Sequence, residues 1–267
     1  MNCGLHRGLI LTATLSIRKH RSTLGRPKEH CPHLSYEPHP AFTLPPDLDA
    51  SLWRYMRFAR LLSMLQTREL FFARADRLGD PFEGSYSRAN LELKDTIVGR
   101  EHTRELRERS CISCWHMNPA ESAAMWRLYG ASDHAVAVRS TTRRLLECLR
   151  ENRHPIYVGV VNYIDYDRTP ISEDNLYHAL LHKRLSFEHE REVRAITSHD
   201  PRFLHPTDVR MPDGVELFAE IEVLVEAIYV APDSPQDLLP TVGRAVADAG
   251  FPGIPVRRSR LGEDPLF

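Results

Sequence analysis

The sequence predicts an α+β fold, with a single domain built on a mixed, largely antiparallel central sheet flanked by helices. Of the 267 residues, 42% are hydrophobic and 27% are charged, which suits a globular protein with a sizeable core. Segments typical of strands and helices are interspersed without a regular βαβ rhythm. Several expected strands also follow one another too closely for parallel crossovers, so antiparallel pairing is favoured.

The expected elements follow from the hydrophobic pattern. Short apolar runs predict strands, in chain order, at 52–55, 70–73, 111–117, 135–138, 156–166, 193–197, 216–223, 227–230 and 254–257. Apolar residues at helical spacing predict helices at 57–68, 86–109, 119–129, 142–150, 173–186 and 235–249. Pro119 suits the first turn of its helix, and Gly250 ends the last one. The Gly-Asp-Pro sequence within 77–84 predicts a loop there.

The first 47 residues differ from the rest of the chain. They are basic, rich in histidine and proline, and without a sustained hydrophobic period. We therefore expect residues 1–47 to be a disordered or loosely attached extension that folding does not need, and residues 48–267 to form the single domain. A misassigned start codon or a nucleic-acid-binding arm would give the same composition, and both alternatives stay open.

Bulk charge and cysteine content restrict the partners and the compartment. Lys and Arg number 35 against 36 Asp and Glu, so net charge does not indicate a nucleic-acid partner or an anionic membrane. No apolar run approaches the length of a membrane span, and residues 8–17 lack the cleavage pattern of a signal peptide. The five cysteines, an odd number, fit a reducing compartment better than a disulfide framework. We expect a cytoplasmic protein with no membrane partner.

Cys111 and Cys114 form the CxxC pair of the chain. Structural zinc needs four ligands, no second pair is present, and on a strand His116 shares a face with Cys114 only. No metal is therefore expected, and the two cysteines are interpreted as buried strand residues. The glycine-rich motifs of Rossmann dehydrogenases and P-loop NTPases are absent from the sequence, as is the nucleophile elbow of α/β-hydrolases.

Two polar motifs are candidates for chemistry. Asp80 and Glu83 lie in a loop directly after a buried strand, a usual place for a site, although Asp80 before a proline also suits plain turn chemistry. Further on, Glu190, Glu192 and Arg194 would share one face if the strand at 193–197 extended back to them. Two carboxylates and a guanidinium at short range can shift a carboxylate pKa, which favours a pocket. An exposed, ion-paired strand face is the alternative.

A third motif runs from the strand at 111–117 into the following helix. Ser113 and Trp115 share one face of that strand. Trp126 is most simply a core residue, whereas Tyr129 carries a hydroxyl that can line a pocket.

The residues resemble a bacterial family called domain of unknown function 2971. The resemblance runs from about Leu52 to Thr197 in the order of that family's motifs. It rests on Trp53-Arg54-Tyr55, Phe71-Phe72-Ala73-Arg74, Asp80-Pro81-Phe82-Glu83, Ser113-Cys114-Trp115, Met125-Trp126-x-x-Tyr129 and Glu188-x-Glu190-x-Glu192-x-Arg194. The family name implies no reaction, and some relatives look like accessory genes of mobile elements and phage defence.

The order Arg54, Ser113, then Glu190 and Glu192 also resembles the Arg-Ser-Glu class of ADP-ribosyltransferases, with Ser-Cys-Trp where that class has Ser-Thr-Ser. The resemblance implies NAD as substrate, with the arginine holding a phosphate, the serine ordering the site and a glutamate stabilising positive charge on the ribose. The implied catalytic residues are Glu190, Glu192 and Ser113. The implied NAD contacts are Arg54, Tyr55, Glu83, Trp126, Tyr129 and Arg194.

We expect six residues to converge on one cleft: Arg54, Glu83, Ser113, Tyr129, Glu190 and Arg194. We expect any catalysis to depend on Glu190 or Glu192. Glu190 is favoured because Arg194 would pair with Glu192, although the transferase pattern favours the second glutamate. Two other functions stay open. One is a module that binds a nucleotide or other ligand without turnover. The other is a metal-dependent nuclease using Asp80, Glu83 and Glu190 with Lys183. The macromolecular acceptor is not indicated.

Overall fold

The computed structural model describes residues 38–92, 99–130, 134–152, 155–198 and 213–265 of the chain. The strands are β1 Ser51–Arg57, β2 Glu69–Arg74, β3 Ser110–Met117, β4 Ala135–Thr141, β5 Ile156–Val160, β6 Asn162–Ile164, β7 His182–Arg184, β8 Glu192–Ser198, β9 Gly214–Phe218, β10 Ala227–Val230 and β11 Val256–Arg258. The α-helices are α1 Phe58–Thr67, α2 Arg88–Glu92, α3 Arg100–Arg109, α4 Ala123–Tyr129, α5 Thr142–Cys148, α6 Tyr177–Leu180, α7 Ile221–Leu224 and α8 Leu238–Asp248. Short 3₁₀ helices include η1 Ala75–Arg77, η2 Leu185–Glu190 and η4 Arg260–Gly262.

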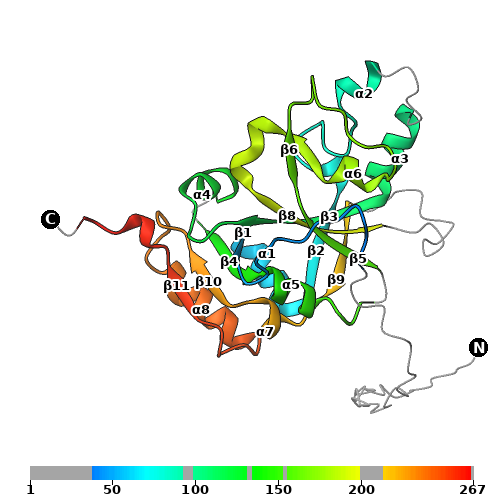
Figure 1. Ribbon diagram of the computed structural model, residues 1–267. Coiled ribbons are helices and arrows are strands. Elements are labelled where there is room, and N and C mark those ends of the chain that lie inside the picture. The colour runs from blue at the N-terminus through cyan, green and yellow to red at the C-terminus, as the bar shows by residue number, and fades with distance from the viewer. Residues whose placement is uncertain (1–37, 93–98, 131–133, 153–154, 199–212, 266–267) are drawn as a thin grey trace, which may run out of the picture. The chain divides into compact units, whose positions relative to one another are not determined.

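One nine-stranded sheet organises the described residues (Figure 1). Its main path runs β11-β10-β4-β1-β3-β2-β9, and β8 pairs with both β3 and β5. Only β10 and β11 pair in parallel within this sheet, while β6 and β7 form a separate parallel pair. The predicted α+β fold with a mixed, largely antiparallel sheet is confirmed.

The sheet divides along one edge of β3. The other edge of β3 pairs with β8 continuously from Ser110 to His116. On the divided edge, β1 pairs only at His116 and Met117, and β2 only at Cys111 and Ile112. Between these two short contacts, β1 continues alongside β4 instead. The sheet is therefore split between β1 and β2, and within the described chain the middle of β3 has no paired strand on that edge.

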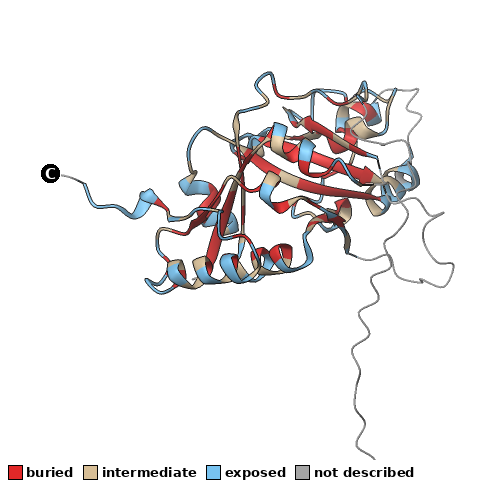
Figure 2. Cartoon of the chain, turned by 90° about the horizontal axis from the view of Figure 1, so that it is seen from below, coloured by how far each residue is buried: buried red, intermediate tan, exposed pale blue. Residues whose placement is uncertain are grey.

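One face of the sheet is covered by α1, α5, α7 and α8 and carries the main hydrophobic core. Each of these helices contributes buried apolar residues, such as Leu65 of α1 and Val242 of α8, against strand residues such as Val138. Figure 2 shows the helices exposed on their outer sides and buried toward the strands. The pattern matches the amphipathic helices that the sequence predicts at 57–68, 142–150 and 235–249.

The opposite face holds two smaller apolar clusters with polar residues between them. An aromatic cluster that includes Trp53 and Trp126 packs under α4. A second cluster, with Ile112 and Ile196, packs against α6 and residues 41–42. Glu192 lies opposite His116 in the β3–β8 pairing, two residues before Arg194, so side-chain alternation places these polar groups between the two clusters.

Residues 38–47 were expected to belong to the loose extension, yet they pack against the sheet. Phe42 is buried, and its ring lies near those of Tyr157 and Tyr177. The backbone of Thr43 accepts a hydrogen bond from Val160. The packed part of the chain therefore begins before residue 48. The sequence did not predict this, because an isolated aromatic side chain carries no periodic signal. Residues 1–37 lie outside the described residues, so their dispensability stays a prediction.

Several expected elements differ from the structure. The helix expected from Pro119 begins only at Ala123, after Ser122 caps it. The helix expected at 173–186 is only the single turn α6, followed by β7 and η2. Asn175 accepts a hydrogen bond from the backbone of Tyr177, and the segment beyond α6 pairs with β6, so a tertiary contact replaces the helix. The strand expected at 216–223 ends at Phe218, and α7 follows it. The expected helix at 86–109 is α2 and α3, with residues 93–98 outside the described part.

Glu190 lies outside the strand, whereas we had considered a strand at 193–197 that extends back to include it. It ends η2, and Arg191 then adopts a left-handed backbone conformation with φ of 42°. This turn breaks the continuity between Glu190 and β8, which begins at Glu192. No helix within the described ranges is long and apolar enough to cross a membrane.

Candidate functional site

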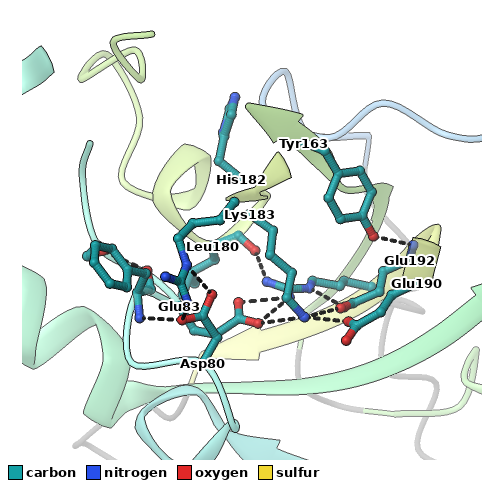
Figure 3. A network of polar contacts seen from close by, with 12 residues as sticks. Asp80, Glu83, Tyr163, Leu180, His182, Lys183, Glu190 and Glu192 are labelled. Atoms are coloured by element: carbon teal, nitrogen blue, oxygen red, sulfur yellow. Dashed lines mark hydrogen bonds and ion pairs between the residues drawn. The ribbon is translucent and has the colours of Figure 1, made fainter. Parts of the chain in front are cut away.

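Lys183 of β7 is the centre of a buried group of charges (Figure 3). Its Nζ lies 3.0 Å from Glu83 Oε1, 2.5 Å from Glu190 Oε2 and 2.7 Å from Glu192 Oε1. The side chain is 6% exposed. Three carboxylates from the loop after β2, the end of η2 and the start of β8 thus converge on one ammonium group.

Arg194 supplies a second cation to the same group. Its Nε donates to Glu192 Oε2 at 2.7 Å, and its Nη2 lies 2.8 Å from Glu83 Oε2. Its Nη1 donates to the carbonyl of Leu180 at 2.6 Å. The side chain is fully buried, so these contacts replace its hydration shell. We call Glu83, Lys183, Glu190, Glu192 and Arg194 the charge cluster.

The charge cluster carries one surplus negative charge when all its groups are ionised, because three carboxylates face two cations. Burial and the neighbouring Glu192 carboxylate raise the pKa of Glu190 to about 7. Burial also opposes ionisation of Glu192, but Arg194 and Lys183 outweigh it and hold the pKa of Glu192 well below its usual range. Glu190 is therefore the group that exchanges a proton near neutral pH.

Glu190 is positioned by two further residues. The Tyr129 hydroxyl of α4 donates to Glu190 Oε1 at 3.1 Å. His116 Nδ1 lies 2.6 Å from the Glu190 backbone oxygen, and since a carbonyl only accepts, Nδ1 is the donor. Burial raises the pKa of the Tyr129 phenol, so the hydroxyl remains a donor at neutral pH.

The loop that carries Glu83 is anchored from within. Asp80 Oδ1 accepts from the backbone N–H of Phe82 at 3.0 Å and from Arg184 Nη2 at 2.7 Å. The Arg184 guanidinium lies 4.3 Å from the centre of the Phe82 ring. Asp80 thus stabilises the turn, and the turn positions Glu83 in the charge cluster.

Arg54 of β1 has a different environment. Its Nη1 donates to Ser113 Oγ at 2.6 Å and its Nη2 to the carbonyl of Phe71 at 2.8 Å. These bonds bridge the split from β1 to β3 and β2. Within the described residues no carboxylate pairs with this guanidinium, and burial lowers its pKa to about 10. Arg54 is therefore a cation without a counterion at the split.

A cavity of about 230 Å³ lies at the split in the sheet. Arg54 and Tyr55 line it from β1, and Lys183, Glu190 and Glu192 line it from the charge cluster. A second cavity of about 200 Å³, which reaches α1, is also lined by Arg54 and Tyr55. The lining of the first cavity thus includes both an arginine without a described carboxylate partner and the carboxylates of the charge cluster.

The structure brings six of the nine candidate residues to this cavity, namely Arg54, Tyr55, Glu83, Tyr129, Glu190 and Glu192. Ser113 does not line it, because it is fully buried under Arg54 and also accepts from Trp115 Nε1. Arg194 is fully buried and acts on Glu83 and Glu192. Trp126 packs in the aromatic cluster, and its Nε1 donates to Glu121, so it is a core residue.

The candidate residues also divide between the two faces of the sheet. Ser113 shares the face of Trp115, which belongs to the main core, whereas Glu192 pairs with His116 on the opposite face. Arg54 lies on the same side as Ser113. Only the split between β1 and β2 allows residues from both faces to line one cavity.

Sequence reasoning gave Lys183 a role only in the nuclease alternative and treated His116 only as a possible metal ligand. Lys183 falls in a segment expected to be helical, where a lysine is normally solvated. The sequence signal for a role of Lys183 in the site was its position between the apolar residue Leu181 and the charged motif from Glu190 to Arg194. For His116 no signal separated it from an ordinary buried strand histidine.

The carboxylates named in the nuclease alternative do not share a free centre. Asp80 pairs with Arg184, whereas Glu83 and Glu190 converge on the ammonium of Lys183. No group of three His, Cys, Asp or Glu side chains within the described ranges is arranged to hold a metal ion. Cys111 and Cys114 are free thiols of β3.

No family model matches the chain, and neither does any curated protein. The resemblance to domain of unknown function 2971 therefore stays a prediction. Among solved structures, "Thermus sp. 2.9 DarT in complex with NAD+" is 12% identical, with a TM-score of 0.39, covering 83% of this chain and 100% of that chain. "Thermus sp. 2.9 DarT in complex with ADP-ribosylated ssDNA" is also 12% identical, with a TM-score of 0.37, covering 82% and 96%. Likeness at this level supports no conclusion about function.

Proposed function

We propose that the chain is an NAD-using ADP-ribosyltransferase-like enzyme, with the cavity at the split as its active site. The observation that carries the proposal is the charge distribution of that cavity. Arg54 contributes a guanidinium without a described carboxylate partner to its lining, and the charge cluster contributes a surplus negative charge. NAD has the complementary distribution, with an anionic pyrophosphate and a cationic nicotinamide ring.

Arg54 would hold the pyrophosphate. A planar guanidinium matches phosphate oxygens in a bidentate geometry. Its present partners, Ser113 Oγ and the Phe71 carbonyl, are neutral acceptors, so its positive charge is not compensated. Ser113 would align the guanidinium from behind. Arg54 lines both cavities, which places it where an elongated dinucleotide would have its middle.

Glu190 and Glu192 would act at the ribose. When the bond between the ribose carbon and the nicotinamide nitrogen breaks, its electron pair leaves with nicotinamide and positive charge develops on the ribose carbon. The carboxylates of the charge cluster stabilise that charge in a site of low water content. Glu190, whose pKa is raised to about 7, then accepts the proton of the attacking acceptor group.

Lys183 and Arg194 would maintain the geometry of these carboxylates. Without the two cations, three buried carboxylates would repel one another and take up protons. Their contacts hold Glu192 ionised and leave Glu190 as the proton-exchanging member. The acceptor and the biological setting, including the phage-defence context suggested by the family resemblance, stay predictions.

The test compares Glu190→Gln with Glu188→Gln in the full chain. Glu188 is an exposed glutamate two residues earlier in η2, so it controls for the substitution itself. We expect the wild type and Glu188→Gln to bind NAD and release nicotinamide, and Glu190→Gln to release it about a hundredfold more slowly. Equal rates in all three proteins would contradict the assignment of Glu190. NAD binding without nicotinamide release by the wild type, with candidate acceptors present, would favour the non-catalytic binding module.

A further inference from the structure

His116 of β3 is buried beside the candidate active site, and one of its ring nitrogens has no hydrogen-bond partner among the described residues. The residue is 4% exposed and lines the cavity with Glu190 and Glu192. Its Nδ1 donates to the backbone oxygen of Glu190 at 2.6 Å. Its Nε2 is buried and has no hydrogen-bond partner within the described chain.

The bond at Nδ1 determines the chemistry available at Nε2. A neutral imidazole carries one N–H, and the carbonyl of Glu190 requires that hydrogen on Nδ1. Nε2 then has a lone pair and acts only as an acceptor. Burial lowers the pKa of His116, which agrees with a neutral ring. A buried acceptor without a partner calls for an explanation, and a ligand in the adjoining cavity supplies one.

We propose that His116 Nε2 accepts a hydrogen bond from a neutral donor of the molecule bound next to Glu190, and so selects ligands that carry such a donor. The inference rests on the proposed function for the identity of that molecule. His116 is bonded to the backbone of Glu190 and lines the same cavity, so its partner would lie beside Glu190, where the proposed function puts the glycosidic bond of NAD. Two parts of NAD present neutral donors there, the carboxamide N–H₂ of nicotinamide and the hydroxyls of its ribose.

A cationic or purely accepting ligand group does not fit this position. A carbonyl or phosphate oxygen would face the Nε2 lone pair and repel it. Cationic ligand groups would bind instead to the carboxylates of the charge cluster, which line the same cavity. His116 therefore contributes selectivity for a hydrogen-bond donor, whereas the neighbouring carboxylates contribute selectivity for charge.

The test is a titration of the full chain, labelled with nitrogen-15 in its histidines, followed by nitrogen chemical shifts. The free protein should show His116 with hydrogen on Nδ1 and an unprotonated Nε2. The three probes are NAD, its acetylpyridine analogue, in which a methyl ketone replaces the carboxamide, and ADP-ribose. A response of Nε2 to NAD but to neither other probe assigns the donor to the carboxamide. A response to all three assigns it to a ribose hydroxyl.

Two substitutions add an affinity measurement. In His116→Asn the amide nitrogen can still donate to Glu190, but the acceptor at the Nε2 position is removed. In His116→Gln the amide oxygen can take the Nε2 position. We expect NAD to bind about tenfold more weakly to His116→Asn, and binding to be partly recovered in His116→Gln.

The outcomes separate this inference from the proposed function. Hydrogen on Nε2 in the free protein overturns the inference whatever the chain binds. NAD binding with no response at Nε2 overturns it and leaves the proposed function in place. Failure of the wild type to bind NAD overturns the proposed function and this inference with it. Because the shift measurements use the wild-type chain, a variant that fails to fold does not prevent the decision.

Discussion

Arg194 and Arg54 are two arginines held within the same sheet with opposite electrostatic environments. Arg194 is fully buried, and its guanidinium contacts two carboxylates and a carbonyl. Arg54 is half-buried, and its described partners are a hydroxyl and a carbonyl, with no carboxylate. Both line or adjoin the cavity at the split, yet only Arg54 has positive charge left uncompensated.

The comparison separates a structural cation from a binding cation. A buried guanidinium that already contacts carboxylates has its charge neutralised and does not bind an anionic ligand. Its removal leaves buried negative charge uncompensated. A guanidinium with neutral partners remains available to an anion and contributes less to folding. Arg194 should therefore control stability, and Arg54 should control binding.

The largest expected effect is on stability, in Arg194→Met. The substitution leaves Glu83 and Glu192 facing Lys183 alone, and breaking a buried pair in this way costs about 3–5 kcal/mol. The free energy of unfolding in urea measures it. Adding Glu192→Met to the same chain should recover part of the loss, because one unpaired carboxylate is then removed. A loss below about 1 kcal/mol for Arg194→Met would remove the distinction between the two arginines.

The next effect is on NAD binding, in Arg54→Met. Loss of a charge-assisted contact to phosphate is worth about 2 kcal/mol, which corresponds to about 30-fold in Kd. Stability should fall by less than in Arg194→Met, because the two lost hydrogen bonds go to neutral acceptors and a buried charge without a described carboxylate partner is removed with them. Titration calorimetry measures the affinity. Arg57→Met, at the exposed end of the same strand, is the matched control and should bind NAD as the wild type does.

The two sides of the cavity should also differ in their response to pH. Glu190 has its pKa raised to about 7 and must be ionised to act, so nicotinamide release should rise as pH increases through 7. The ionised fraction changes about tenfold between about pH 6 and about pH 8, and kcat should follow it. Arg54, with its pKa lowered only to about 10, stays charged throughout, so NAD affinity should change less. A kcat profile that is flat over this range, in a protein that is active, would assign the proton exchange to another group.

The smallest expected effect is in Ser113→Ala. Ser113 Oγ accepts from both Arg54 Nη1 and Trp115 Nε1, and without it the guanidinium loses the partner that aligns it. We expect NAD affinity to fall about threefold to tenfold. Ser110→Ala is the matched control, because Ser110 is buried on the same strand and its hydroxyl has no hydrogen-bond partner among the described residues. If both variants bind NAD equally well, Ser113 has no part in positioning Arg54.

Much of the fold was predictable because it depends on short-range patterns. The strands at 70–73, 111–117 and 193–197 are apolar runs that the structure contains as β2, β3 and β8. The helices at 57–68 and 235–249 have apolar stripes that face the main core. The helix expected at 173–186 was wrong, because pairing of β7 with β6 is a long-range contact that leaves no local pattern.

The sequence predicted part of the membership of the candidate site but not its arrangement. Glu190, Glu192 and Arg194 were identified as a charged group from their spacing, although Glu190 lies in η2 and not on the strand. Lys183, which joins these residues to Glu83, was predicted to act only in the nuclease alternative and not in the transferase site. A lysine is normally solvated, and only the buried convergence of three carboxylates explains its position.

The sequence by itself determined the α+β class, most of the strands and which polar motifs belong together, because hydrophobic period and residue spacing are local properties of the chain. The tertiary structure alone decided that β1 and β2 share one edge of β3 and leave a split. That split allows Arg54, on one face of the sheet, and Glu190, associated with the other, to line a single cavity. Strand pairing depends on contacts between distant segments, so neither the split nor the unpaired charge of Arg54 could be derived from spacing along the chain.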